Sequence, residues 1–528
     1  MLSFSSSFVQ PLFVRMLLVT IVFACGICVT GAPCVTGAPG ATDRPNIVYI
    51  LADDLGIGDV RAFNPQGKIA TPNIDQLAAE GMRFTDAHAG SAVCTPTRYG
   101  ILIGRYSWRS RLRKGVGWGY SLPFIPETRL TVASMLQRQG YGTACIGKWH
   151  LGLKWALHDE ANPPSDSSTE PWDNIDFSRP IRSGPNQLGF DYFFGISASL
   201  DMHPHVYVRD DRVTSVPERI DPGSGGMKFW RQGPIADDFQ HIQVLDTLTQ
   251  EAVAYIESQS PDEPFFLYFP LPAPHKPIIP NGNFQDKSGL NAWGDFVMQV
   301  DWTVGQVMQA LMRRQLADST LLIVTSDNGA TPGADFEALG RHGHDPSQIY
   351  RGHKADIFEG GHRVAFVARW PATIAADATC TETVCHTDLL ATAAEITGFD
   401  LPADAGEDSV SLLPAMMGQA AGPIREATIH HSVNGRFAIR QGQWKLVLCP
   451  GSGGWSKPRA AEAREAGLPD AQLFDLAADI AETNNLWDVH ADVVQRLGDL
   501  LRKYIDDGRS TPGETQANDT VVTILPGS

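Results

Sequence analysis

Short apolar runs that recur along the chain, separated by segments with helical signals, constrain the fold more than any other feature. Five of these runs are rich in β-branched and aromatic residues and cover residues 46–51, 143–146, 265–269, 321–325 and 364–368. Each run is bounded by turn-forming residues, which is typical of a strand buried on both faces of a sheet. Strands that alternate with helices favour an α/β sandwich with a large central sheet between helices.

Two of the intervening segments carry clear helix boundaries. Residues 71–81 start with Thr-Pro and end with Gly, and residues 131–140 start with Thr and end with Gly. Threonine caps the first helical turn, proline fits the first helical position, and glycine commonly follows the last turn. Helices are therefore expected in both segments.

The pattern changes after about residue 423. Shorter runs at 436–440 and 444–448 predict strands, and a helical stretch follows near 491–504. These elements predict a smaller C-terminal α+β subdomain that ends in a polar tail over 510–528. The predicted organisation is a signal peptide and leader over 1–40, a main domain that carries the catalytic site over 41–422, and a C-terminal subdomain with its tail over 423–528.

The first 40 residues resemble a secretory leader. Arg15 precedes an apolar run over 16–29, which is short for a membrane span but typical of a signal peptide. A tandem repeat over 28–39 suits a cleavage region or flexible leader. The expected location is therefore secreted or periplasmic after cleavage, with a lipid anchor at Cys25 or Cys28 left open. No later segment is apolar enough to predict an integral membrane anchor.

Composition and charge narrow the partners. With 528 residues, 43% hydrophobic and 19% charged, the chain has the composition of a globular protein with room for a large domain and a smaller one. The formal net charge of -17 argues against a nucleic-acid partner, because phosphates would be repelled. Any anionic substrate must therefore meet a local basic pocket. Five cysteines outside the leader are too few for a disulfide scaffold; Cys380 and Cys385 form either a local disulfide or two free thiols.

Hard oxygen donors follow two of the predicted strands. Asp53 and Asp54 come directly after the first run, and Asp327 and Asn328, followed by Gly329, come directly after another. Carboxylate and amide oxygens suit Ca²⁺ or Mg²⁺ better than a soft metal. Taken singly, each pair is also typical of a turn or helix cap. The two pairs together predict a metal site at the edge of the sheet where open α/β sheets bind ligands.

Five basic side chains complete the candidate site: Arg98, Lys148, His150, His275 and Lys354. All five are expected beside strand-end segments. A lysine at a strand end is more often solvated, and a histidine between prolines more often fills a loop. A bound anionic ester, however, needs fixed cations around its oxygens and an acid at its leaving group. One shared site explains all five positions.

The segment Cys94-Thr-Pro96-Thr-Arg98, followed by Gly104-Arg105, matches the C-x-P-x-R plus G-R signature of the formylglycine-dependent sulfatases. Thr97 stands where many members have serine, and both carry a hydroxyl. The chain resembles this family from about residue 45 to 371, and again near 444–446, 473–476 and 482–486. The other blocks that carry the resemblance are Asp53-Asp54, Gly147-Lys148-Trp149-His150, Gly189-Phe190-Asp191 with Phe194-Gly195, Pro274-His275, Asp327-Asn328-Gly329, and Lys354 with Glu359-Gly-Gly361.

This resemblance implies an alkaline-phosphatase-like fold and a role for each matched residue. A maturation enzyme would oxidise Cys94 to formylglycine (3-oxoalanine), whose hydrate attacks the sulfur of a sulfate monoester, and a second hydroxyl of the hydrate would later expel sulfate. One Ca²⁺ per chain would be bound by Asp53, Asp54, Asp327, Asn328 and modified residue 94. Arg98 and His150 would hold the hydrate, Lys148 and Lys354 would bind the sulfate, and His275 would protonate the leaving alcohol.

The substrate is expected to be a sulfated carbohydrate cleaved in an exo manner, with a galacto-configured 6-sulfate preferred. Trp118 and Tyr120 are candidates to stack on the sugar, and Asp201, His203 and His205 to bond its hydroxyls; ordinary loop packing explains these five equally well. The alternatives are a phosphonate or phosphodiester hydrolase of the same superfamily and an inactive sulfated-glycan-binding protein. A dinuclear zinc phosphatase is disfavoured, because its Ser/Thr nucleophile and its additional His and Asp ligands have no clear counterpart in this sequence. Oligomeric state is left open.

Overall fold

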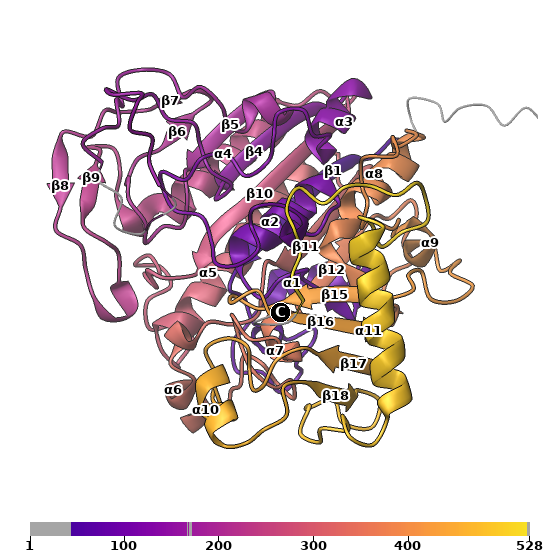
Figure 1. Ribbon diagram of the computed structural model, residues 1–528. Coiled ribbons are helices and arrows are strands. Elements are labelled where there is room, and N and C mark those ends of the chain that lie inside the picture. The colour runs from indigo at the N-terminus through magenta and orange to yellow at the C-terminus, as the bar shows by residue number, and fades with distance from the viewer. Residues whose placement is uncertain (1–43, 166, 168–171, 525–528) are drawn as a thin grey trace, which may run out of the picture. The chain divides into compact units, whose positions relative to one another are not determined.

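The computed structural model describes residues 44–165, 167 and 172–524 (Figure 1). The predicted signal peptide, the tandem repeat, Cys25 and Cys28 lie outside these residues. A ten-stranded sheet has the order β13-β2-β12-β11-β1-β10-β4-β5-β6-β7. In that order the strands are Ala378–Cys380, Met82–Phe84, Phe366–Arg369, Thr320–Ser326, Asn46–Asp53, Phe265–Pro274, Gly142–Lys148, Tyr192–Ile196, Val208–Arg209 and Arg212–Val213.

The centre of the sheet consists of parallel strands. β1 pairs in parallel with β10 and β11, β10 pairs with β4, and β4 pairs with β5. Every residue of β1, β10 and β11 is buried, so both faces of the sheet are covered. The five strands predicted from apolar runs overlap β1, β4, β10, β11 and β12, which confirms the α/β sandwich.

Two groups of helices cover the sheet. In the first, α5 (Ala292–Arg313) contacts both α1 (Pro72–Ala79) and α4 (Val244–Ser258), and α4 and α5 pack on β10. In the second, α2 (Cys94–Ile103), α3 (Val132–Arg138) and α8 (Leu389–Thr397) contact one another. Thr131 caps α3 by accepting from the N–H of Ser134 at 2.9 Å, as expected. Thr71, by contrast, donates its hydroxyl to Asp75 and does not cap α1.

Smaller elements connect these layers. The short helices are α6 (Phe336–Arg341), α7 (Glu359–His362), α9 (Leu413–Met416) and α10 (Ala460–Glu465). Two small two-stranded sheets pair β3 (Ala87–His88) with β14 (Val384–Cys385), and β8 (Arg219–Asp221) with β9 (Gly233–Ile235). All five cysteines in the described part of the chain are buried free thiols. Cys380 and Cys385 are therefore two free thiols and do not form the local disulfide that was the other possibility. Among the described helices, none combines the length and apolarity that crossing a membrane requires.

A second, antiparallel sheet follows the change of pattern at residue 423. Its order is β15 (Thr428–His431), β16 (Phe437–Gln441), β17 (Trp444–Val447) and β18 (Gln472–Asp475). Helix α11 (Ala491–Asp506) packs on β16 and β17 through its apolar stripe of Val493, Leu497 and Leu501. This arrangement confirms the predicted C-terminal α+β unit, which is coloured orange to yellow in Figure 1.

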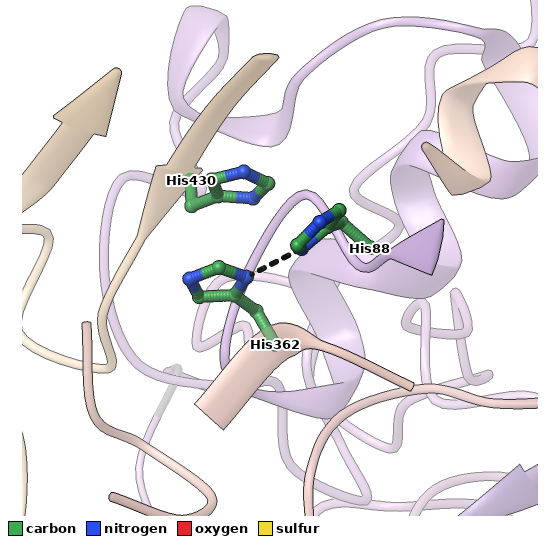
Figure 2. A group of neighbouring side chains, drawn as sticks. All are labelled: His88, His362 and His430. Atoms are coloured by element: carbon green, nitrogen blue, oxygen red, sulfur yellow. Dashed lines mark hydrogen bonds between the residues drawn. The ribbon is translucent and has the colours of Figure 1, made fainter. Parts of the chain in front are cut away.

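A buried histidine cluster, formed by His88, His362 and His430, joins this second sheet to the main body (Figure 2). His88 Nε2 lies 2.8 Å from Asp86 Oδ1 and 3.0 Å from Arg440 Nη1, and His88 Nδ1 lies 3.1 Å from His362 Nδ1. His362 Nε2 then accepts from the ammonium of Lys445 at 3.1 Å. Burial lowers the pKa of all three imidazoles, which keeps the rings neutral.

The histidine cluster does not fit a metal ion. The rings of His362 and His430 stack with centroids 3.9 Å apart and planes 5° apart. Imidazole lone pairs lie in the ring plane, so two parallel stacked rings cannot direct them at one ion. A positive charge on Lys445 also lies beside the cluster. The cluster is therefore a hydrogen-bonded connection between the two sheets.

Candidate active site

Two neighbouring parallel strands bring the predicted oxygen donors together at their carboxyl ends. Asp53 is the last residue of β1 and Asp54 follows it, while Asp327 and Asn328 follow β11. The N–H of Asp54 donates to Asp327 Oδ1 at 3.2 Å, and Asn328 Nδ2 donates to Asp54 Oδ1 at 2.7 Å. All four side chains are buried. They form one compact acidic cluster.

Two lysines bind the carboxylates of this acidic cluster. Lys148, the last residue of β4, places Nζ 2.5 Å from Asp53 Oδ2. Lys354 places Nζ 2.6 Å from Asp54 Oδ1. Neither ammonium is appreciably exposed, so both charges act where water does not screen them.

Arg98 supplies the third cation. Its Nε and Nη2 donate to Asp327 Oδ2 at 3.1 and 2.7 Å. Arg98 and Lys354 lie beside the strand ends without belonging to a strand of the sheet. Arg98 lies in the first half of α2, and Lys354 lies in a loop that precedes α7. Both reach the site because α2 and this loop lie against the same edge of the sheet.

Cys94 is the first residue of α2 and is 3% exposed. Its Sγ belongs to a group of possible ligand atoms, with a carboxylate oxygen each from Asp53 and Asp327, that all lie within 4.8 Å of one another. Burial raises the pKa of its thiol although the nearby lysine charges act in the opposite direction. An unmodified thiol here would thus remain protonated at neutral pH and would be a weak nucleophile.

The hydroxyl of Thr97 holds the turn before α2. Thr97 Oγ1 lies 3.1 Å from the carbonyl oxygens of both Ser91 and Val93, to which it can donate. Serine carries the same hydroxyl, so the substitution within the signature retains this contact. The departure from serine at position 97 therefore has no structural cost in the described fold.

His150 lies two residues after the end of β4. Its Nε2 donates to the carbonyl of Gly117 at 2.9 Å, and its Nδ1 is buried with no hydrogen-bond partner among the described residues. Burial and the nearby charges of Lys148 and Arg98 lower the pKa of this imidazole well below its usual value. His150 is therefore neutral, and its Nδ1 carries a free lone pair.

His275 follows β10 with its two ring nitrogens in different surroundings. Nδ1 donates to the carbonyl of Lys276 at 2.6 Å and lies 3.1 Å from Ser199 Oγ. Nε2 lies 3.7 Å from Asp54 Oδ2. Because Nδ1 is held by the loop, Nε2 is the nitrogen that faces the acidic cluster.

Backbone strain concentrates at this site. Asp54, His150 and Ala355 have φ values of 69°, 57° and 80°, in the left-handed region that non-glycine residues rarely adopt. Gly329 is required by close approach, because a Cβ there would lie 1.8 Å from the carbonyl oxygen of Gly360. Such strain persists only where surrounding structure enforces it, and it is typical of functional sites.

The carboxylates are electrostatically crowded. Burial alone would raise the pKa of Asp53, but the Lys148 ammonium and other nearby cations hold it well below its usual range. Burial and the neighbouring Asp53 charge raise the pKa of Asp327 to about 7. Burial would lower the pKa of Lys354, and the Asp54 carboxylate raises it instead. Additional positive charge would relieve this crowding.

The acidic cluster fits a hard divalent cation. Asp53 Oδ1 and Asn328 Oδ1 are buried oxygens without a hydrogen-bond partner in the described structure. A buried oxygen left unpaired costs about 1–3 kcal/mol, and a cation would offset this cost. The residue types offer oxygen only, which suits Ca²⁺ or Mg²⁺.

The five predicted sugar-binding residues separate into two groups. Tyr120 and His205 are each 1% exposed; Tyr120 packs against Trp155, and His205 packs against His241. Both side chains lie within the packing of their loops, and the Tyr120 hydroxyl has no hydrogen-bond partner among the described residues. Trp118, by contrast, is half-buried.

Asp201 and His203 remain candidates because their polar groups are unpaired. Asp201 Oδ1 and His203 Nδ1 are buried atoms without a hydrogen-bond partner in the described part of the chain. Asp201 Oδ1 also lies 4.0 Å from His275 Nδ1. Both residues therefore have unused hydrogen-bonding capacity, and that of Asp201 lies beside His275.

Two residues at the site carry no signal in the sequence. Ser199 Oγ accepts from Lys148 Nζ at 3.1 Å and lies equally close to His275 Nδ1, so it connects two elements of the site. Arg231 forms an ion pair with Asp201. Neither residue stands in a recognisable motif, and only the fold brings them to the active site.

The fold and the site together define an enzyme that hydrolyses esters of a tetrahedral oxyanion. An acidic cluster fit for a hard cation, three buried cations and two differently poised histidines surround residue 94 on an alkaline-phosphatase-like sheet. The sulfatase family model matches residues 45–399. The chain belongs to the sulfatase family and is a sulfuric ester hydrolase.

Individual relatives agree with this assignment. The chain is 35% identical over 498 residues to an N-acetylgalactosamine-6-O-sulfatase of Bacteroides thetaiotaomicron. The alignment covers 87% of this chain and 92% of the relative. It is 32% identical over 468 residues to human arylsulfatase A, covering 84% and 83%. A solved structure from work on glycosaminoglycan metabolism by Bacteroides thetaiotaomicron has a TM-score of 0.76 at 34% identity, covering 87% of this chain and 99% of that one.

Proposed function

We propose that this enzyme removes sulfate from a sulfated carbohydrate in an exo manner, through a formylglycine derived from Cys94 and one bound Ca²⁺. The observation that supports the proposal most strongly is the enclosure of residue 94 by a compact acidic cluster and three buried cations. Side chains that are fixed before the substrate arrives stabilise developing charge without reorganisation. A sulfate ester needs this arrangement because its charge is spread over several oxygens.

The proposed Ca²⁺ ligands are Asp53, Asp54, Asp327, Asn328 and residue 94. A bound cation would supply positive charge to one sulfate oxygen and would help to orient the ester. The free oxygens of Asp53 and Asn328 support this ligand set. Lys148 and Lys354 would then turn from the carboxylates toward the sulfate, since each ammonium carries three donors.

An aldehyde hydrate in place of the Cys94 thiol, as the family generally uses, would supply the oxygen nucleophile. Arg98 and His150 would orient this hydrate, and the free lone pair on His150 Nδ1 suits it to take a proton from a hydroxyl. His275 would deliver a proton from Nε2 to the leaving alcohol; since its Nδ1–H stays bonded to the carbonyl of Lys276, the ring would enter this step as the doubly protonated imidazolium. Proton removal and proton delivery thus belong to different histidines.

The preferred substrate is a galacto-configured sugar with a 6-sulfate. A relative with this named activity, N-acetylgalactosamine-6-O-sulfatase, aligns over most of both chains and supports the choice. Phosphonate or phosphodiester hydrolysis is the competing activity, because the phosphonate monoester hydrolase of Agrobacterium radiobacter shares the fold with a TM-score of 0.55 at 18% identity. Likeness at that identity concerns the fold alone.

A substrate screen tests the proposal. We expect the matured enzyme, coexpressed with a formylglycine-generating enzyme, to hydrolyse N-acetylgalactosamine 6-sulfate faster than any phosphodiester or lipophilic sulfate. Released sulfate or phosphate would be measured at matched substrate concentrations. Faster turnover of bis(4-nitrophenyl) phosphate than of every sulfated sugar would contradict the carbohydrate assignment.

Metal removal should abolish this activity. After treatment with a chelator, we expect turnover of 4-nitrophenyl sulfate to fall by at least about a hundredfold, because several kcal/mol of charge stabilisation would be lost. Calcium should restore the activity, and elemental analysis of untreated enzyme should find one hard divalent ion per chain. Two tightly bound zinc ions per chain would instead indicate a phosphatase-like centre.

We also propose that the enzyme acts outside the cytoplasm. The signal-like segment over 1–40 supports secretion or periplasmic location, and a sulfated saccharide is met there. The catalytic domain would extend over 41–422, and the C-terminal subdomain with its tail over 423–528. N-terminal sequencing of exported protein would locate the cleavage site and test this division at its first boundary.

A further inference from the structure

Arg231 occupies a built position at the edge of the active site. It lies between η4 (Gly226–Lys228) and β9, and its guanidinium lies over the rings of Trp118 and Phe229 at 5.0 and 5.1 Å from their centroids. Cation–π contacts on two rings fix the plane of the guanidinium. Its side chain is still 29% exposed, so one face of the group is open.

This guanidinium holds one oxygen of Asp201 and leaves the other unused. Arg231 Nη1 pairs with Asp201 Oδ2, and the N–H of Arg231 also donates to the carbonyl of Asp201 at 3.0 Å. Asp201 Oδ1 has no hydrogen-bond partner among the described residues, although the Asp201 side chain is 8% exposed. A buried carboxylate oxygen that is fixed in place but unpaired is suited to accept a donor from a ligand.

The free oxygen points to the leaving-group side of the site. Asp201 Oδ1 lies 4.0 Å from His275 Nδ1. This nitrogen is already occupied, because Lys276 O and Ser199 Oγ lie closer to it, at 2.6 and 3.1 Å. The free oxygen of Asp201 is therefore not needed as a partner for His275, and it lies beside the histidine proposed to protonate the leaving alcohol.

We propose that Asp201 and Arg231 form a pair that selects for a sugar leaving group. Asp201 Oδ1 accepts a hydrogen bond from a hydroxyl of the sugar that carries the sulfate, and Arg231 is the positioning residue that fixes this carboxylate. The ring of Trp118 packs against the Arg231 guanidinium and lies at the same edge of the active site. This inference rests on the proposed function and adds to it a pair of residues that recognises the sugar alcohol from which sulfate is removed.

Such a pair should discriminate between substrates with and without sugar hydroxyls. A site that is built to bond a hydroxyl loses binding when the hydroxyl is missing, because its buried polar group is then unpaired. An aryl sulfate has no hydroxyl at this position. Loss of the pair should therefore affect a sulfated sugar more than an aryl sulfate.

The test compares kcat/KM for N-acetylgalactosamine 6-sulfate and 4-nitrophenyl sulfate in matured enzyme. Asp201→Asn and Arg231→Met keep the side-chain size and remove charge. For both variants, we expect the fall on the sugar to exceed the fall on the aryl sulfate by about tenfold or more, as loss of a charged hydrogen bond implies. Arg231→Lys should recover part of the ratio. Arg219→Met is the matched control. Arg219 lies on β8 and forms an exposed ion pair with Asp237, so its replacement should change neither activity.

Either of two outcomes would overturn the proposal. An equal fall on both substrates in Asp201→Asn and Arg231→Met would assign the pair a structural role only. No fall on either substrate would mean that neither residue contributes to binding the sugar. If wild-type enzyme hydrolyses 4-nitrophenyl sulfate but no sulfated sugar, the sugar-reading pair is wrong while the sulfatase reaction stands. Activity on neither sulfate in aldehyde-bearing enzyme would instead refute the proposed function itself.

Discussion

Replacing Cys94 with alanine should lower kcat/KM for 4-nitrophenyl sulfate by at least about a thousandfold, because removal of a catalytic nucleophile typically costs this much or more. Residue 94 lies beside the carboxylates of Asp53 and Asp327, which the lysine and arginine charges of the site surround. Mass spectrometry of wild-type protein should find the peptide containing residue 94 without its sulfur and reactive toward a carbonyl probe.

Cys449→Ala is the matched control for this variant. Cys449 is also a buried free thiol, but it lies after β17 in the C-terminal unit. Both variants should lose a similar, small amount of stability, on the order of 1 kcal/mol, while the control retains full activity. Fully active wild-type enzyme that contains only a thiol at residue 94 would contradict the proposed nucleophile.

Replacing Lys445 with alanine should cause the largest loss of stability, about 3–5 kcal/mol. Its ammonium is completely buried and lies 2.9 Å from Glu359 Oε1 and 2.8 Å from Glu482 Oε1. Without it, two buried carboxylates would face each other with no intervening cation, and His362 would lose its donor. Urea denaturation followed by tryptophan fluorescence would measure the change in the free energy of unfolding.

Lys503→Ala provides the comparison on the surface. Lys503 pairs with Asp507 on α11, and its side chain is 65% exposed, so its removal should change stability by less than about 1 kcal/mol. The double variant Lys445→Met with Glu482→Gln should recover part of the loss, because it removes one uncompensated charge. Similar midpoints for Lys445→Ala and Lys503→Ala would show that the buried charges contribute little.

The sequence predicted the interior of the main sheet because its central strands are buried on both faces. Such strands are apolar throughout and need no partner information to be recognised. The order of the strands in the sheet, by contrast, could not be predicted from the sequence. β12 pairs antiparallel with β11 and with β2, which precedes it by almost 300 residues, and no local pattern records such pairing. The strands β6 and β7 at one end of the sheet were missed because each has only two residues and shows no periodic pattern.

The site was predictable where a motif carries it. Asp53, Asp327 and Lys148 occupy the positions that their strands implied. The positions of Ser199 and Arg231 depend on how loops cross the end of the sheet, which sequence spacing does not encode. Tyr120 is 1% exposed and packs within its connecting loop, a position that the sequence alone did not distinguish from a ligand-facing one.

The burial of Cys94 has a consequence for the order of events in biosynthesis. At 3% exposure, with its helix packed against the sheet, this residue cannot enter the active site of a second enzyme once the chain has folded. Its oxidation would therefore have to compete with folding, and the time available would end when α2 docks. Purified thiol-containing protein should resist later conversion unless it is first unfolded, so the yield of active enzyme would be set during synthesis.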